Sequence, residues 1–434
     1  MDAGLLSCCC GYVGALARLA AGGWLGLTGD VTDLVVVVGG GLAGAKVVET
    51  LRGEGYDGAV VMLAAESELP YERPTLSKGY LAGTDPFDTA VVHDLAWYDE
   101  HDVDLRRGTT ATGLEPTRHR VDLGDGSALT YHRLVLATGA TPIRPAFPGA
   151  GTAAVLRTRA DADALRVRLV PDARVAIIGG GWIGLETAAA AIGRGARVTV
   201  LESGRAPLAR ALGARIGAAW GEAHRSHGVD LRTGVEVTEI ADHGVRLADG
   251  SSVDADLVLL AVGARPETRI AESAGLTVDD GVLTDAALRT SHPDVLAVGD
   301  VANAFHPRYR RHVRVEHWAN ALNQGPAAAR TILGEDVEYR RIPYFYTDQF
   351  ELGMEYAGHS DPDADVLVRG DLDSGSYQAF WVRPADGDTV VVEAAMHVNR
   401  WEPGIEPLKS LVEAETPVER RRLVDEDVAL DDLG

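Results

Sequence analysis

The chain has 434 residues, a formal net charge of −23 at pH 7, 50 glycines and few aromatic residues. This length allows two or three domains with sizeable cores, and the composition is typical of an α/β protein. The strongly acidic balance argues against general affinity for nucleic acid, so we expect no nucleic-acid partner.

All three cysteines, Cys8, Cys9 and Cys10, stand in one run near the N-terminus. The body of the chain therefore offers neither a disulfide framework nor a cysteine metal cluster, and we expect no metal centre. This cysteine usage favours an intracellular, cytoplasmic location. Residues 1–32 are apolar and glycine-rich but lack a positive leading region and a span long enough to cross a membrane. We expect a disordered leader or a start codon chosen too far upstream, rather than a targeting signal or a membrane anchor.

The stretch from Leu34 to Gly44, LVVVVGGGLAG, is typical of a dinucleotide-binding turn. Four valines predict a buried parallel strand, and Gly39, Gly41 and Gly44 follow with the spacing GxGxxG before a helical pattern. The helix start would hold the pyrophosphate through its free N–H groups. Residues 59–63 predict the next strand, and Glu66 near its end is the acidic residue expected to bind a ribose hydroxyl.

A second fingerprint occupies residues 175–184, VAIIGGGWIG, with glycines at 179, 181 and 184. Residues 185–192 predict the helix that follows, and 197–201 the next strand. Glu202 at its end would accept from the 2′-hydroxyl of NAD and repel the 2′-phosphate of NADP, although the nearby Arg205 weakens that preference. Two fingerprints predict two dinucleotides, and FAD with a nicotinamide is the natural pair because electrons can pass between them.

Short apolar strands are predicted at 134–139 and 294–298. From about residue 341 aromatic side chains cluster, a strand-like run follows at 389–392, and helical runs are expected at 405–414 and 418–424.

Five motifs in this order resemble the FAD-dependent ferredoxin reductases of the glutathione-reductase-like flavoproteins. They are PYERPTLSK (70–78), LVLATGA (134–140), VLAVGDVA (295–302), VEHWANALNQG (315–325) and PYFYTDQFELG (343–353). The resemblance implies an α/β fold with two Rossmann-like domains and a C-terminal α+β domain. It implies a discontinuous FAD-binding domain at 33–146 and 265–340, an NAD-binding domain at 147–264 and a C-terminal domain at 341–434.

The resemblance also implies roles for individual residues. Lys78 and Glu186 are expected to act as a catalytic pair beside the flavin, where the lysine would stabilise negative charge on the reduced ring. The residues expected to bind FAD are Gly39, Gly41, Ala43, Gly44, Glu66, Arg73, Lys78, Ala111, Arg157, Asp300 and Trp318. Those expected to bind NAD are Gly179, Gly181, Ile183, Gly184, Glu202 and Gly263. Ala65 stands where close relatives carry aspartate, so only Glu66 can supply that ribose contact.

No cysteine follows Cys10, so the redox cysteines of disulfide reductases have no counterpart, and we expect electrons to leave directly from the flavin. A basic run within the acidic chain comprises Arg308, Arg310, Arg311, His312 and Arg314. Such a run is often only a solvated face, but a positive patch would steer an acidic [2Fe–2S] ferredoxin.

The resemblance therefore predicts an NADH:ferredoxin oxidoreductase that supplies a P450 or a Rieske-type oxygenase. Two alternatives remain: a reductase of rubredoxin or another acceptor, including an NADH oxidase, and a redox-sensing binding protein of the apoptosis-inducing-factor kind. Neither the cognate ferredoxin nor the oligomeric state can be read from the residues.

Overall fold

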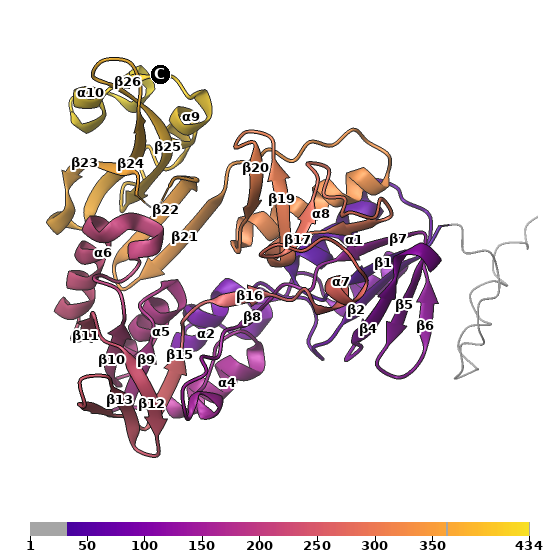
Figure 1. Ribbon diagram of the computed structural model, residues 1–434, viewed down its shortest axis with the longest axis horizontal. Helices are drawn as coiled ribbons and strands as arrows, with labels where there is room; N and C mark the ends of the chain where they lie inside the picture. Colours follow the sequence, from indigo (N-terminus) through magenta and orange to yellow (C-terminus); the bar gives the residue numbers. More distant parts are fainter. Residues whose placement is uncertain (1–32, 362, 434) are drawn as a thin grey trace, which may run out of the picture.

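The computed structural model describes residues 33–361 and 363–433 (Figure 1). The predictions for residues 1–32, including the three cysteines, lie outside the described residues. Two parallel sheets and one antiparallel C-terminal sheet form the main bodies of the molecule, and Figure 1 shows the C-terminal sheet above the second parallel sheet.

The first parallel sheet has the strand order β18-β7-β1-β2-β3. Its strands are β1 (Val35–Val38), β2 (Val60–Ala64), β3 (Val103–Arg107), β7 (Arg133–Leu136) and β18 (Val295–Ala297). All four residues of β1 are buried, as a continuous apolar run in a parallel sheet requires. Helices α1 (Leu42–Gly53) and α8 (Trp318–Ile332) pack together on one face, and a small antiparallel sheet covers the other. Its strands are β4 (Ala111–Glu115), β5 (Arg120–Leu123) and β6 (Ala128–Thr130).

The second parallel sheet repeats this plan with the order β11-β10-β9-β15. Its strands are β9 (Arg174–Ile178), β10 (Arg197–Glu202), β11 (Asp230–Thr233) and β15 (Leu257–Leu260). Helices α5 (Trp182–Gly193) and α6 (Ala209–Ser226) contribute to the core on one face. The other face packs on a second antiparallel sheet of β12 (Val237–Ala241), β13 (Gly244–Leu247) and β14 (Ser252–Asp254).

Two short antiparallel strands connect the two halves of the molecule. β8 (Ala140–Pro142) leaves the first sheet and pairs with β16 (Ala264–Pro266), where the chain comes back from the second sheet. Further along, β17 (Val282–Thr284), β19 (Ala302–His306) and β20 (Arg311–Arg314) form a three-stranded sheet on the flank of the first. Helix α3 (Leu95–Glu100) packs on β3 of the first sheet, while α2 (Gly79–Ala82) packs against α4 (Arg159–Arg168) and α5.

The C-terminal sheet is antiparallel, with the order β21-β22-β25-β24-β23 and β26 paired to β25. Its strands are β21 (Tyr344–Gln349), β22 (Leu352–Gly358), β23 (Asp365–Asp371), β24 (Ser376–Pro384), β25 (Thr389–Val398) and β26 (Val418–Glu419). The expected helices are present as α9 (Glu406–Ala414) and α10 (Arg420–Val424), with α9 packed on β25.

The predicted fold class is confirmed: two parallel α/β units precede a C-terminal α+β unit. The exact domain boundaries stay predictions. Within the described ranges 33–361 and 363–433, no helix is both long and apolar enough to span a membrane.

Candidate functional site

One cavity of about 1450 Å³ extends along the carboxyl ends of both parallel sheets and reaches β21 of the C-terminal sheet. This volume exceeds that of a typical site for one small ligand. Most of the residues predicted to bind a nucleotide line it, together with the predicted catalytic residue Glu186. They are Gly39, Gly41, Ala43, Glu66, Arg73, Lys78, Ala111, Arg157, Asp300 and Trp318 from the FAD set and Gly179, Gly181, Ile183, Glu202 and Gly263 from the NAD set. The structure thus brings the two sets of residues into a single space.

The two remaining glycines, Gly44 and Gly184, lie behind the cavity wall. A Cβ on Gly44 would collide with the carbonyl oxygen of Gly39, and a Cβ on Gly184 with that of Gly179. Gly39 and Gly179 have φ values of +131° and +106°, which disfavour any residue with a side chain. The third glycine of each fingerprint therefore permits close packing of helix and turn, while the first permits the turn itself.

Two ion pairs form the polar wall beside the first glycine turn. Glu66 binds Arg73 at 2.7 Å, and Asp300 binds Arg157 at 2.7 Å. Tyr71 donates its hydroxyl to the second oxygen of Glu66 at 2.6 Å, and burial raises the pKa of Tyr71, so the phenol keeps its proton. The link between the two pairs is Arg73, which also donates to the backbone oxygen of Arg157. The charges are thus held in place before a ligand arrives.

On the nicotinamide side, Glu202 sits at the end of β10 as predicted. Its carboxylate accepts from the backbone N–H of Gly180 at 2.7 Å and from that of Gly204 at 2.5 Å. Each carboxylate oxygen has a second lone pair, so Glu202 can accept from a ribose hydroxyl while it keeps these two bonds.

Lys78 and Glu186 meet where the two parallel sheets and the C-terminal sheet converge. The Lys78 Nζ lies 2.5 Å from Glu186 Oε1, and only 5% of the glutamate side chain is exposed. Ser77 donates to the other carboxylate oxygen, and Thr347 of β21 donates to Oε1 at 2.6 Å. A buried carboxylate needs such partners because its desolvation is costly. Sequence reasoning found the pair but missed Ser77 and Thr347.

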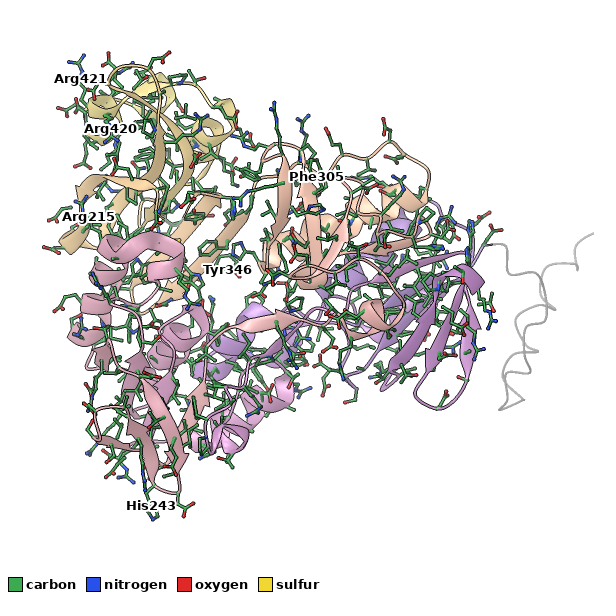
Figure 2. All side chains as sticks on the ribbon, viewed as in Figure 1. Arg215, His243, Phe305, Tyr346, Arg420 and Arg421 are labelled. Atoms are coloured by element: carbon green, nitrogen blue, oxygen red, sulfur yellow. The ribbon has the colours of Figure 1, made fainter. Side chains whose placement is uncertain are left out.

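Aromatic side chains close the cavity next to this pair. The Lys78 ammonium lies 5.5 Å from the ring centre of Tyr346, which Figure 2 places near the middle of the molecule. Trp318 packs edge-on against Tyr346. Its indole Nε1 and the Nδ1 of His317 are buried and have no polar partner in the part of the chain that the structure describes. Burial lowers the pKa of His317 to about 4, so its imidazole is neutral at pH 7.

These features fit a flavin dinucleotide. A planar ring with hydrogen-bond acceptors could satisfy the buried Trp318 N–H, the glycine turns admit close approach of a pyrophosphate, and carboxylates suit ribose and ribityl hydroxyls.

Only part of the basic run is exposed as the predicted positive patch requires. Arg308 donates to Glu413 O at 3.1 Å and forms an ion pair with Glu415 at 3.1 Å. Arg314 pairs with Asp280 at 3.1 Å and with Glu316. These two side chains are only 16% and 15% exposed because acidic partners hold them. Arg310 and Arg311 are exposed at the turn between β19 and β20, the hairpin on which Figure 2 labels the exposed Phe305.

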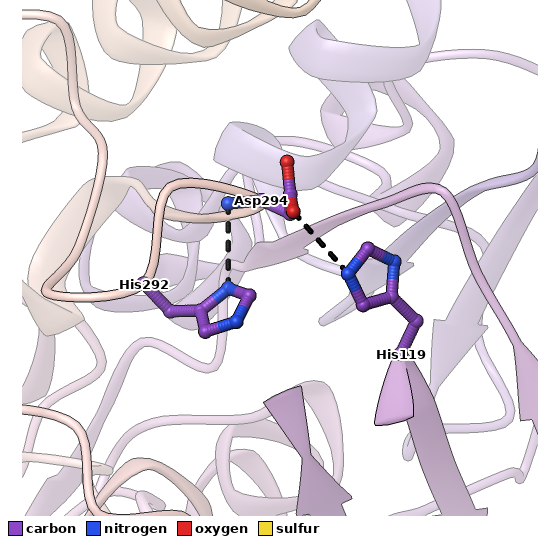
Figure 3. A group of neighbouring side chains, drawn as sticks. All are labelled: His119, His292 and Asp294. Atoms are coloured by element: carbon purple, nitrogen blue, oxygen red, sulfur yellow. Dashed lines mark hydrogen bonds and ion pairs between the residues drawn. The ribbon is translucent and has the colours of Figure 1, made fainter. Parts of the chain in front are cut away.

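Three side chains of residue types that can bind a metal ion lie close together near the start of β18 (Figure 3). Atoms of His119, His292 and Asp294 lie within 4.8 Å of one another. However, Asp294 binds the Arg133 guanidinium at 2.7 Å, and the Nδ1 of His292 accepts the backbone N–H of Asp294 at 3.4 Å. The arginine charge opposes a cation, so the arrangement favours a structural role that fixes the loop before β18. The expectation of no metal centre stays a prediction.

Comparison with known proteins identifies the family. The family model described as "Pyridine nucleotide-disulphide oxidoreductase" matches residues 33–325, and the one described as "Reductase C-terminal" matches residues 344–434. The chain belongs to the pyridine nucleotide-disulphide oxidoreductase family.

Two curated members of this family are similar to the chain over nearly their whole length. The ferredoxin–NAD(+) reductase component of the anthranilate 1,2-dioxygenase system of Burkholderia cepacia is 39% identical, covering 92% of this chain and 98% of the relative. Putidaredoxin reductase of Pseudomonas putida is 36% identical, covering 93% and 97%.

Solved structures of family members have the same fold. The reductase in a covalent putidaredoxin reductase–putidaredoxin complex has a TM-score of 0.86 at 36% identity and covers 92% of this chain and 97% of that chain. A ferredoxin reductase for the CYP199A2 system from Rhodopseudomonas palustris has a TM-score of 0.86 at 30% identity, covering 92% and 99%.

Proposed function

We propose that the chain is an NADH-dependent FAD flavoprotein that passes electrons to a [2Fe–2S] ferredoxin, which in turn supplies a P450 or a Rieske-type oxygenase. The observation that carries the proposal is the single cavity into which both glycine turns and the Lys78–Glu186 pair open. No cysteine follows Cys10 in the sequence, so the described residues, 33–361 and 363–433, offer no thiol acceptor at this cavity. The names of the similar reductases support the same acceptor class.

FAD, when bound, accepts a hydride from NADH and releases electrons one at a time. The residues of the chain bind and orient the two nucleotides and set the charge around the rings. Arg73 and Arg157, each paired with a carboxylate, would hold the ribose, ribityl and phosphate groups of FAD. Lys78 would balance the negative charge that hydride transfer adds, while Glu186 holds the ammonium in position.

The experiment that tests the proposal is NADH-driven reduction of cytochrome c with and without a panel of [2Fe–2S] ferredoxins. We expect turnover to depend strongly on one of them. Fast reduction of rubredoxin, or oxygen consumption that ferredoxin does not change, would favour the alternative reductase and oxidase functions. Slow turnover with every acceptor would favour the redox-sensing binding protein.

Glu202 is expected to make NADH the preferred donor. The wild-type catalytic efficiency with NADH should exceed that with NADPH by at least about tenfold, because a carboxylate repels the 2′-phosphate and accepts from the 2′-hydroxyl. Glu202→Ala should lower the ratio of the catalytic efficiency with NADH to that with NADPH. Steady-state kinetics with both donors measure this ratio. Equal use of both donors by the wild type would contradict this role, for example if the exposed Arg205 binds the 2′-phosphate.

We propose that Arg310 and Arg311 contribute to ferredoxin docking. Reversing both charges in Arg310→Glu/Arg311→Glu should raise the KM for ferredoxin about tenfold at low salt, and the effect should shrink as salt rises. A matched control is Arg420→Glu/Arg421→Glu, an adjacent arginine pair on α10 at a distant part of the surface (Figure 2). Ferricyanide reduction should stay unchanged in both. If the two double variants behave alike toward ferredoxin, the hairpin is not the docking site.

A further inference from the structure

A chain of buried hydrogen bonds leads away from the Lys78–Glu186 pair through residues that do not line the nucleotide cavity. Thr347 donates to Glu186 Oε1 at 2.6 Å, Gln349 Nε2 lies 3.1 Å from Thr347 Oγ1, and His224 Nε2 lies 2.8 Å from Gln349 Oε1. We call these three residues the relay. Their exposed fractions are 1%, 1% and 0%. The relay starts on α6 beside the second parallel sheet and continues on β21 of the C-terminal sheet, and its last hydrogen bond reaches Glu186 on α5 (Figure 1).

Every bond of the relay has only one direction that satisfies its atoms. An ionised carboxylate can only accept, so the Thr347 hydroxyl must donate to Glu186. That hydroxyl therefore accepts from the amide nitrogen of Gln349, which turns the amide oxygen toward His224. The imidazole must then donate from Nε2. Burial lowers the pKa of His224 to about 4, so the ring is neutral at pH 7 and carries a single N–H for this bond.

Three dipoles thus point in series toward the negative charge of Glu186. Hydrogen bonds in such a chain polarise one another, and the low dielectric of a buried site strengthens them. Thr347 and Lys78 contact the same oxygen, Oε1, so the relay fixes the oxygen that holds the ammonium. Gln349 and His224 do not line the nucleotide cavity, and their effect must pass through the glutamate.

We infer that Thr347, Gln349 and His224 form a positioning relay that orients Glu186 and, through it, holds Lys78 at the reacting end of the cavity. The relay makes the reactive geometry depend on the docking of the C-terminal sheet against α5 and α6. This inference rests on the proposed function, because it assigns the relay to the same hydride-transfer site.

The test is a double-mutant cycle with Lys78→Ala. Thr347→Val should lower the rate constant for flavin reduction by NADH about tenfold, and Gln349→Leu should lower it about threefold. Thr347→Ser keeps the hydroxyl, so its rate constant should recover most of what Thr347→Val loses. The dissociation constant for NADH should change less than about twofold. In the Lys78→Ala background each substitution should change the rate less than about twofold, because residues that act through one group are not additive.

A second readout does not depend on turnover. The reduction potential of the bound flavin should move in the same direction in Thr347→Val and Gln349→Leu as in Lys78→Ala. The double variant His224→Leu/Gln349→Leu removes both partners of one hydrogen bond, so neither partner is left buried and unpaired. It can therefore replace Gln349→Leu in the test if that variant does not fold. His397→Gln is the matched control, because His397 is a fully buried imidazole of the C-terminal sheet that binds Glu355 at 2.8 Å.

Equal fold-losses in the wild-type and Lys78→Ala backgrounds would overturn the relay, and so would an unchanged rate and potential in the relay variants. A wild-type protein that NADH does not reduce would instead contradict the proposed function, so the two failures can be told apart.

Discussion

Gly184→Ala is expected to leave FAD bound but to abolish efficient reduction by NADH. The added methyl group would collide with the backbone oxygen of Gly179, which cannot move without opening the turn that ends β9. Overpacking of this kind costs about 1–3 kcal/mol or more, so we expect the dissociation constant for NADH to rise on the order of 100-fold. The equivalent change in the first turn, Gly44→Ala, should instead yield protein without flavin, because its Cβ would collide with Gly39.

The measurement combines the visible absorbance of the purified protein with anaerobic titration by NADH. Gly184→Ala should remain yellow and should still be bleached by dithionite, which needs no nicotinamide site. Gly193→Ala is the matched control, since it lies at the end of the same helix and its added Cβ would have no described atom within 4 Å apart from its chain neighbours and the nearby backbone of that helix. Normal NADH titration of Gly184→Ala would show that the second glycine turn does not bind the donor.

Lys78→Ala is expected to slow flavin reduction by NADH about 100-fold or more while it changes NADH binding little, because the ammonium acts mainly on charge that develops during the reaction. The substitution leaves Glu186 buried with Ser77 and Thr347 as its donors, so the carboxylate keeps two hydrogen bonds without a counter-charge. The remaining negative charge would oppose reduction further.

Stopped-flow measurement of the reductive half-reaction separates these effects, since the plateau rate reports hydride transfer and the half-saturation concentration reports binding. Lys409→Ala is a suitable control, because Lys409 also pairs with a glutamate, at 2.7 Å, but on α9 outside the cavity. An unchanged plateau rate in Lys78→Ala would remove the lysine from the reacting site.

The parallel strands and their glycine turns were predictable because their signals are local. Four consecutive valines form β1, and the second fingerprint runs from β9 through the glycine turn into the first residues of α5. Helix α8 has a weaker local signal, since Gly325 and Pro326 stand in its middle. Gly325 is tolerated there because α8 packs against α1, and a Cβ at this position would lie 2.7 Å from Ala43 O. Tertiary packing thus overrides a pattern that argues against a helix.

The partners of the site residues could not be predicted, because they are distant in the sequence. Thr347 lies 161 positions from Glu186, and no periodicity connects the two. The ion pairs within the basic run could not be predicted from the sequence for the same reason. A cluster of arginines indicates a positive patch, but the acidic partner of Arg308, Glu415 just after α9, becomes visible only in the fold.

The most direct test of the central proposal is an anaerobic titration of the FAD-loaded protein, first with NADH and then with oxidised [2Fe–2S] ferredoxin. We expect about one equivalent of NADH to bleach the flavin absorbance and about two equivalents of ferredoxin to restore it, because a hydride carries two electrons and the iron–sulfur protein accepts one. Protein that stays colourless when FAD is supplied, or absorbance that ferredoxin does not restore, would contradict the proposed electron transfer.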